Sequence, residues 1–253
     1  MRLAIMQPYF FPYIGYWQLI HAADRFVVYD DVNYIKRGWI NRNRILINGK
    51  PAYITAPLHQ ASQFKRICDT TLHPSLGWRD KLARMIEVTY RRAPNFADVF
   101  PILDQLIRYE TNALAEYLTH QLRALSEFMG IDTEFVPSSR GYENSHLKGE
   151  QRILDICIRE GATDYVNPQG GQDLYDTGTF KGRGIELRFI DTHPLPYPQR
   201  SAGFVPYLSI IDLLMEVGPA KIREHLESFE LVDKKDTVKS LSSWGVTSGR
   251  HSP

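Results

Sequence analysis

The first 31 residues constrain the fold more than any other part of the chain, because short apolar runs alternate there with polar and aromatic turns. Apolar runs at residues 3–6 and 26–29 flank a segment with apolar periodicity, residues 14–22. The two runs are too short for helices and apolar on both faces, as the strands of a buried parallel sheet are. The segment between them is long enough for a crossover helix. We therefore predict a βαβ unit at the start of the chain.

Polar and aromatic residues follow both predicted strands. Residues 7–13 follow the first strand, and residues 30–34 follow the second. In βαβ units, ligands bind in the crevice outside the carboxyl ends of the strands. We therefore expect these two loops to edge a binding site.

Composition sets broad limits on the class of protein. The 253 residues, 43% of them hydrophobic, suffice for one sizeable core, and a formal charge of +1 argues against a generally basic nucleic-acid binder. Cys68 and Cys157 lack metal-type spacing and fit a reducing compartment. No apolar run approaches the ~20 residues of a membrane span, and the start of the chain lacks a signal-peptide core. We expect a cytoplasmic protein.

A β-hairpin is predicted after the second strand. Asn48 and Gly49 lie between two apolar runs and tolerate the positive φ angles of a type I′ turn. The basic segment around this hairpin, residues 36–50, holds five Lys and Arg residues and no acid. We expect Lys36, Arg37 and Arg42 to hold an anionic group beside the first crevice edge. The alternative is ordinary charge on a solvated loop.

Residues 74–130 are predicted to form a helical insertion. Apolar positions at helical spacing indicate helices within residues 74–94, 96–109 and 114–128, and Gly130 supplies the last stop. They are expected to pack beside the sheet.

A second α/β portion follows the helical insertion. Strands are predicted from residue 133 and at residues 164–167 and 186–190, with a helix at residues 148–160, and a final apolar helix spans residues 208–217. Residues 233–253 are rich in Lys, Ser, Thr and Gly and are expected to form a disordered tail. The sequence therefore predicts one α/β domain, residues 1–232, with a Rossmann-like, largely parallel sheet, an inserted β-hairpin and a helical region.

The chain contains none of the phosphate-loop, dinucleotide, nucleophile-elbow or zinc-helix motifs. The candidate bases are Asp30, Asp31 and His146. Adjacent acids on a strand point to opposite faces, so at most one of the two aspartates is expected to line the crevice if the strand continues through both. No metal site is predicted and no cofactor is named. The candidate substrate-binding residues are the polar, basic or glycine residues of the predicted crevice loops and their surroundings: Gln7, Tyr16, Lys36, Arg37, Asn41, Arg42, Lys148, Asn167, Gly170 and Gly171.

Four separated blocks of the sequence resemble the WbqC-like family of bacterial proteins. The blocks, in order, are QPYFFPYIGYWQLI, ADRFVVYDDVNYIKRGWINRNRI, KGEQRILDICIREGATDYVNPQGGQDLYD and LSIIDLLMEVG. The resemblance implies an association with gene sets for O-antigen, a part of lipopolysaccharide, and other surface polysaccharides. It names a pathway more firmly than a reaction.

The opening also resembles, more weakly, the start of HIGH-type nucleotidylyltransferases. Gly15 and Tyr16 stand where that class has a Gly-His pair. The histidines of that class stabilise charge on the transferring phosphoryl group, and a tyrosine carries no positive charge for this task. The resemblance implies a shared architecture without the same chemistry.

Three functional hypotheses follow. The leading one is a transferase that acts on a sugar or sugar-nucleotide precursor of surface polysaccharide, an anionic small molecule, by moving an acyl or aminoacyl group. The second is a non-catalytic small-molecule or nucleotide-binding protein of the same pathway, and the third is a nucleotide-binding relative that has kept the fold and lost the chemistry. Donor, acceptor and oligomeric state stay open at this point.

Overall fold

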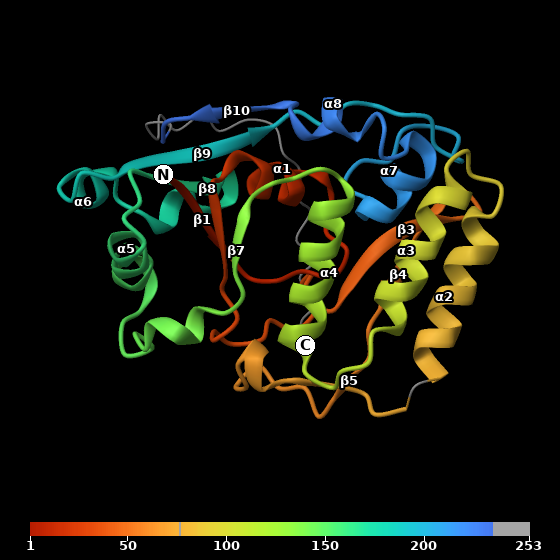
Figure 1. The fold of residues 1–253 in the computed structure, drawn as a ribbon, viewed down its shortest axis with the longest axis horizontal. Coiled ribbons are helices and arrows are strands. Elements are labelled where there is room, and N and C mark those ends of the chain that lie inside the picture. Colours follow the sequence, from red (N-terminus) through yellow and green to blue (C-terminus); the bar gives the residue numbers. More distant parts are fainter. Residues whose placement is uncertain (76, 235–253) are drawn as a thin grey trace, which may run out of the picture.

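The computed structural model describes residues 1–75 and 77–234. Its centre is a six-stranded sheet (Figure 1), which contains β1 (Arg2–Met6), β2 (Arg25–Val28), β7 (Glu134–Val136), β8 (Asp164–Pro168), β9 (Glu186–Thr192) and β10 (Phe229–Val232). The spatial order is β10-β9-β8-β1-β2-β7, and every neighbouring pair is parallel except β9 and β10. Counted along the chain, this is the Rossmann order 3-2-1-4-5-6, whose switch point lies between β1 and β8. The predicted largely parallel α/β fold is confirmed.

The predicted βαβ unit at the start of the chain is confirmed. Helix α1 (Ile14–Ala22) connects β1 to β2, which pair in parallel with Leu3 opposite Arg25. Gly15 in the first turn of α1 allows a close approach, because a Cβ there would lie 2.5 Å from the ring of Tyr13. The loop between β1 and α1 is therefore packed tightly against the helix that follows it.

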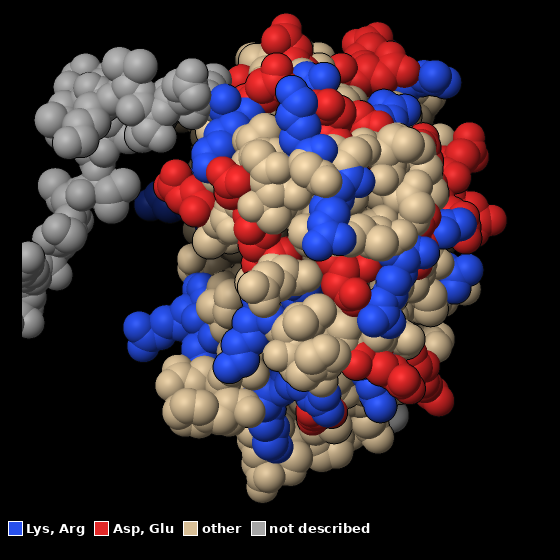
Figure 2. All heavy atoms as spheres, turned by 90° about the vertical axis from the view of Figure 1, so that its left-hand side faces the viewer, with Lys and Arg blue, Asp and Glu red and all other residues tan. Residues whose placement is uncertain are grey.

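The sheet separates two apolar layers. Strand residues such as Ala4, Phe26 and Val28 belong to a large core that includes residues of α1, α2, α3, α4 and α7. Their neighbours Leu3 and Val27 point to the other face, where they belong to a smaller core with residues of α5 (Gly149–Arg159) and α6 (Thr177–Lys181). Alternation along each strand thus produces a three-layer arrangement. Figure 2 shows acidic and basic side chains interspersed on the side of the molecule where α5 and α6 lie.

The predicted β-hairpin forms a separate two-stranded sheet of β3 (Arg42–Ile47) and β4 (Lys50–Thr55). At its turn the φ angles are 52° for Asn48 and 74° for Gly49, as a type I′ turn requires. A second small ladder pairs β5 (Leu58–His59) with β6 (Thr71–Leu72), and the 3₁₀ turn η1 (Ile67–Asp69) lies between them.

Three long helices form the predicted helical insertion. These are α2 (Gly77–Tyr90), α3 (Phe96–Arg108) and α4 (Leu114–Phe128), and their apolar stripes all contribute to the large core. Two shorter helices, α7 (Ile210–Val217) and α8 (Ile222–Leu226), complete this layer.

The end of the described chain is β10, an antiparallel edge strand that the sequence pattern did not predict. Of the predicted tail, the structure describes Asp233, which pairs with Arg188, and Lys234, which donates to the carbonyl oxygen of Tyr175. Residues 235–253 lie outside the described residues. Among the described helices, none is long and apolar enough to span a membrane.

Candidate functional site

Two cavities lie at the carboxyl edge of the sheet. The first, called the switch-point cavity here, has a volume of about 520 Å³ and is lined by residues at the carboxyl ends of β1 and β8, including Gln7 and Asn167. The second, called the α4 cavity, has a volume of about 550 Å³ and lies between α4 and the loops that follow β2 and β7. Ligands of open α/β sheets bind at this edge, and the switch point is the usual place.

The switch-point cavity brings together four of the predicted binding residues: Gln7, Asn167, Gly170 and Gly171. Asn167 ends up buried, and its amide nitrogen donates to the hydroxyl of Tyr165 at 2.6 Å. The turn η3 (Gln169–Leu174) then folds closely over it.

The two adjacent glycines of this turn have different roles. A Cβ on Gly171 would lie 2.1 Å from Oδ1 of Asn167, whereas a Cβ on Gly170 would meet no atom within 4 Å. Gly171 therefore permits the close packing of the turn on Asn167, and Gly170 faces open space. Because most of the remaining lining is apolar, this cavity suits an uncharged ring held by a few amide contacts.

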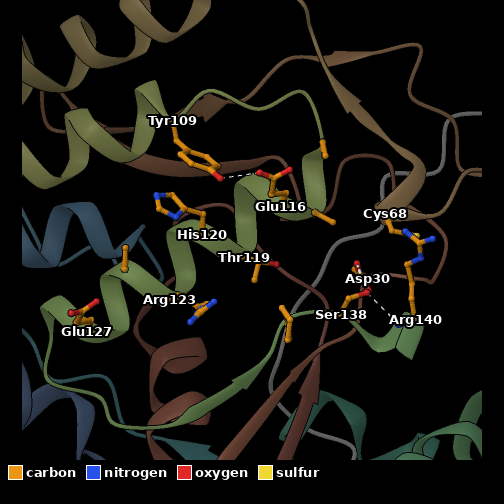
Figure 3. Close-up of a pocket in the computed structure, with 14 residues that line it drawn as sticks. Asp30, Cys68, Tyr109, Glu116, Thr119, His120, Arg123, Glu127, Ser138 and Arg140 are labelled. Carbon is orange, nitrogen blue, oxygen red and sulfur yellow. Dashed lines mark hydrogen bonds between the residues drawn. The ribbon is translucent and has the colours of Figure 1, made fainter. Parts of the chain in front are cut away.

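The α4 cavity gathers ionisable groups (Figure 3). Asp30 lies on one side, 3% exposed, and its carboxylate accepts hydrogen bonds from Oγ of Ser138 at 2.8 and 3.0 Å and from the backbone N–H of Ser139 at 3.1 Å. Burial raises the pKa of Asp30 above its ordinary value, although these hydrogen bonds act against the increase. A raised pKa makes this carboxylate a better proton acceptor than an exposed aspartate.

The opposite wall of the α4 cavity is the polar face of α4. His120 stacks on Tyr109 with ring centroids 3.9 Å apart, and burial lowers the pKa of His120, so its imidazole is neutral at neutral pH. Arg123 on α4 and Arg140, after β7, are exposed at the cavity and can contact an anionic group (Figure 3). Cys68 also lines the cavity, but burial raises the pKa of its thiol to about 11, so the nucleophilic thiolate is scarce.

Sequence reasoning missed His120 and Arg123. Their signal was present, since positions 116, 120, 123 and 127 lie three or four residues apart and carry Glu, His, Arg and Glu on one helix face. Only the apolar stripe of this helix entered the prediction.

A buried ion pair lies just after the end of β2. Asp31 accepts hydrogen bonds from Nη2 of Arg152 on α5 and from Oγ of Ser139, and the side chains of the pair are 4% and 5% exposed. Arg152 also donates from Nε to Oδ1 of Asn144 at 2.9 Å. Strand β2 ends at Val28, so strand alternation does not apply to Asp30 and Asp31, and the hydroxyl of Ser139 donates to both carboxylates. Asp30 lines the α4 cavity, whereas Asp31 lines neither cavity. Its contacts are those of a structural group.

Three further predicted residues lie outside both cavities. The hydroxyl of Tyr16 donates to the carbonyl oxygen of Gln7 at 2.7 Å, so this buried side chain holds the loop after β1 in place. His146 and Lys148 are exposed in the segment before α5 and line neither cavity, although the next residue, Gly149, lines the switch-point cavity.

The basic segment before the hairpin also lies apart from the two cavities. Lys36 and Arg37 are exposed, and Arg42 donates to the carbonyl oxygens of Gly38 and Arg37. Asn41 is buried, where it accepts a hydrogen bond from the hydroxyl of Tyr34 and donates to Ala56, both at 2.8 Å. None of these four predicted residues lines either cavity, so the single site expected around Gln7, Asp31 and Lys36 is not formed.

The residues of 1–75 and 77–234 include no group of three or more His, Cys, Asp or Glu side chains placed to hold a metal ion.

Comparisons with known proteins agree with the sequence resemblance. The model of the WbqC-like protein family matches residues 7–224, which include most residues of both cavities. An uncharacterized protein of Mycobacterium tuberculosis is 32% identical over 219 residues, which cover 86% of this chain and 94% of the relative. No solved structure matches the chain.

Proposed function

The chain belongs to the WbqC-like protein family, and we propose that it is a transferase that moves an acyl or aminoacyl group to or from a sugar or sugar-nucleotide precursor of surface polysaccharide. One observation carries the proposal. Asp30, a buried carboxylate with a raised pKa, faces a cavity that also holds two exposed arginines at the carboxyl edge of the sheet. The polysaccharide pathway comes from the family resemblance.

In the proposed reaction, Asp30 is the general base. It takes a proton from a hydroxyl or amine of the acceptor while that atom attacks the carbonyl carbon of the donor. A new ester or amide bond forms, and the bond between the carbonyl carbon and the leaving group breaks. The raised pKa favours the protonated Asp30 that this step produces, and His120 is a second proton acceptor in the same cavity.

The remaining groups bind and orient the substrates. Arg123 and Arg140 contact a phosphate or carboxylate through charge-assisted hydrogen bonds. Gln7 and Asn167 orient an uncharged part of a substrate in the switch-point cavity. Tyr29 and Asp30 are neighbours in sequence and line different cavities, so the two cavities flank the same strand end and offer places for two parts of the substrates near Asp30.

A second candidate function is non-catalytic binding in the same pathway. It is favoured by the environment of Asp30, whose carboxylate already accepts hydrogen bonds from Ser138 and Ser139. A carboxylate satisfied in this way can serve to hold the loop after β7 in place.

The two candidates differ in one experiment. The full chain is incubated with pairs of sugar nucleotides and acyl thioesters, and product is detected by mass spectrometry, while thermal shifts report binding. For a transferase, we expect Asp30→Asn to lower kcat at least 10²-fold with the ligand shift retained. Glu127→Gln, in the same cavity, is the matched control and should change kcat by less than about threefold.

Each outcome decides between the candidates. Full activity of Asp30→Asn would exclude Asp30 as the base. Thermal shifts with sugar nucleotides but no product from any pair would favour the binding protein.

A further inference from the structure

A third cavity lies apart from the proposed reaction centre. This aromatic cavity has a volume of about 260 Å³ and is lined by Tyr9, Tyr13, Trp39, Arg44 and Tyr207, with Pro12 and Asn43. Its walls come from the loop after β1, the segment before β3, strand β3 itself and the segment before α7. Of these residues, none lines the switch-point cavity or the α4 cavity.

Arg44 is the unusual group in this cavity. Its guanidinium lies 5.6 Å from the ring centroid of Trp39, and its Nε is buried without a hydrogen-bond partner in the described part of the chain. Because this nitrogen has almost no accessible surface, a ligand in the cavity would contact the outer Nη nitrogens of this half-buried side chain. The planar fork of a guanidinium matches a carboxylate, so a bound carboxylate is the natural partner for Arg44.

Arg42 provides an internal comparison on the same strand. Its guanidinium lies 4.5 Å from the ring centroid of Tyr53, but it donates to two backbone carbonyl oxygens, those of Gly38 and Arg37. Both arginines therefore stack on an aromatic ring. The difference is that the donors of Arg42 are used within the protein, whereas Nε of Arg44 is not.

The aromatic walls favour a sugar ring over a nucleobase. The rings of Tyr13 and Tyr207 are 5.8 Å apart and inclined by 75°, so they form a corner and not a parallel slot. A flat base stacks best on aligned rings, whereas a pyranose packs its C–H face on one ring and turns its hydroxyls to the polar edges of the others. Burial raises the pKa of Tyr9 and of Tyr13, so both phenols stay protonated and can donate to such hydroxyls.

The size of the cavity limits the ligand to about one ring. Its 260 Å³ lies just below the roughly 300–1,000 Å³ of sites for larger small molecules. We propose that the aromatic cavity is a binding subsite for a single acidic sugar, a hexuronic acid whose carboxylate contacts Arg44 and whose ring packs against the aromatic walls. This subsite is separate from the Asp30 chemistry and does not depend on whether the chain is a transferase.

The test uses D-glucuronate as the probe for the full chain. Binding is measured by saturation-transfer NMR and by calorimetry, with D-glucose as the neutral analogue and uridine 5′-monophosphate as an anion that carries a base. We expect glucuronate to bind at least tenfold more tightly than either, because a charge-assisted contact is lost with glucose and the corner shape is wrong for a base. Arg44→Gln should weaken glucuronate binding at least tenfold, and Arg42→Gln should leave it unchanged.

A second variant guards against a folding defect in Arg44→Gln. Tyr207 is 54% exposed, so Tyr207→Ala should keep the melting temperature while it weakens glucuronate binding severalfold. Absence of glucuronate binding, equal binding of glucose, tighter binding of uridine 5′-monophosphate, or equal effects of the Arg44 and Arg42 variants would each overturn the proposal.

Discussion

Asp30 and Asp31 show how much the environment of one residue decides at this sheet edge. Both carboxylates are buried, but Asp31 has a guanidinium partner and Asp30 has only hydroxyl and amide donors. A buried charge with a full counter-charge is a structural group, whereas a buried carboxylate without one has its pKa raised. The partner from α5 therefore makes Asp31 a structural acid, whereas Asp30, bonded to residues at the start of η2 (Ser139–Tyr142), stays a candidate base.

The first prediction concerns the buried ion pair. Arg152→Leu leaves the charge of Asp31 buried and unpaired, so the free energy of unfolding should fall by about 3–5 kcal/mol. The matched control is Arg159→Leu on the same helix, whose 48% exposed side chain pairs with Asp155 and donates to the carbonyl oxygen of Tyr142, with an expected change of about 1 kcal/mol. Urea unfolding of both variants checks this. Similar decreases in the free energy of unfolding would show that the buried Asp31 pair contributes no more to stability than the exposed one.

The second prediction concerns Asp30 and pH. Its pKa is raised in the folded state, so folding takes up a proton there, and stability is lost as pH rises from the ordinary carboxyl range, about 4, through the raised value. Asp30→Asn removes this titration and keeps an oxygen that accepts from Ser139. The variant should therefore gain stability relative to the original chain as pH rises through that window. Thermal unfolding from pH 4 to pH 8 measures the difference, and a constant offset would argue against a raised pKa.

At the scale of elements, the turn η3 supports the switch-point cavity through Gly171. In Gly171→Ala, the new Cβ displaces the side chain of Asn167 and breaks its hydrogen bond to Tyr165, which should cost about 1–3 kcal/mol and weaken any ligand of this cavity. Gly170→Ala is the adjacent control, expected within about 0.5 kcal/mol because its Cβ meets nothing. Thermal unfolding and thermal-shift titration of both variants compare them, and equal stability would mean that Asn167 relaxes freely.

Local pattern was sufficient for most elements of the fold. The βαβ opening, the hairpin at Asn48 and Gly49 and the helices of the insertion each have a strong local signal in apolar spacing or turn chemistry. Strand β10 has four residues, and among the described strands it pairs with β9 alone, so its formation depends on a contact distant in sequence. The strand order likewise depends on β7 pairing with β2 and β8 returning to β1, which no local pattern specifies.

The candidate site was harder to predict than the elements. Gln7, Asn167 and Gly171 were identified because they follow strands, and strand ends fix their location. Asn41 and Arg42 were also polar residues after a strand, yet Asn41 bonds to Tyr34 and to the backbone of Ala56, and Arg42 donates to its own loop's backbone. Which polar side chain satisfies local backbone groups and which faces a cavity is decided by tertiary packing.

For the whole molecule, the sheet is completed only by the last described strand. Strand β10 pairs with β9 from Phe229 to Val232, and Phe229, Leu231 and Val232 pack against the two cores. The core of the domain therefore extends to Val232, and ion pairing and hydrogen bonding continue to Lys234.

The last prediction compares two truncations at this end of the chain. Removal of residues 235–253 takes away a segment poor in apolar residues, so we expect the melting temperature to shift by less than about 2 °C.

Removal of residues 229–253 also deletes β10, which exposes the edge of β9 and apolar surface of both cores. Full burial of such a side chain contributes about 1.5–3 kcal/mol, and these three are half-buried, so their loss together with the strand pairing should lower the melting temperature by several degrees or prevent folding. An exposed edge strand also invites pairing between chains. The protein that ends at residue 228 should therefore aggregate in size-exclusion chromatography, whereas the protein that ends at Lys234 should behave like the full chain. A large loss of stability on removal of residues 235–253 alone would instead show that this segment, including Trp244, stabilises the fold.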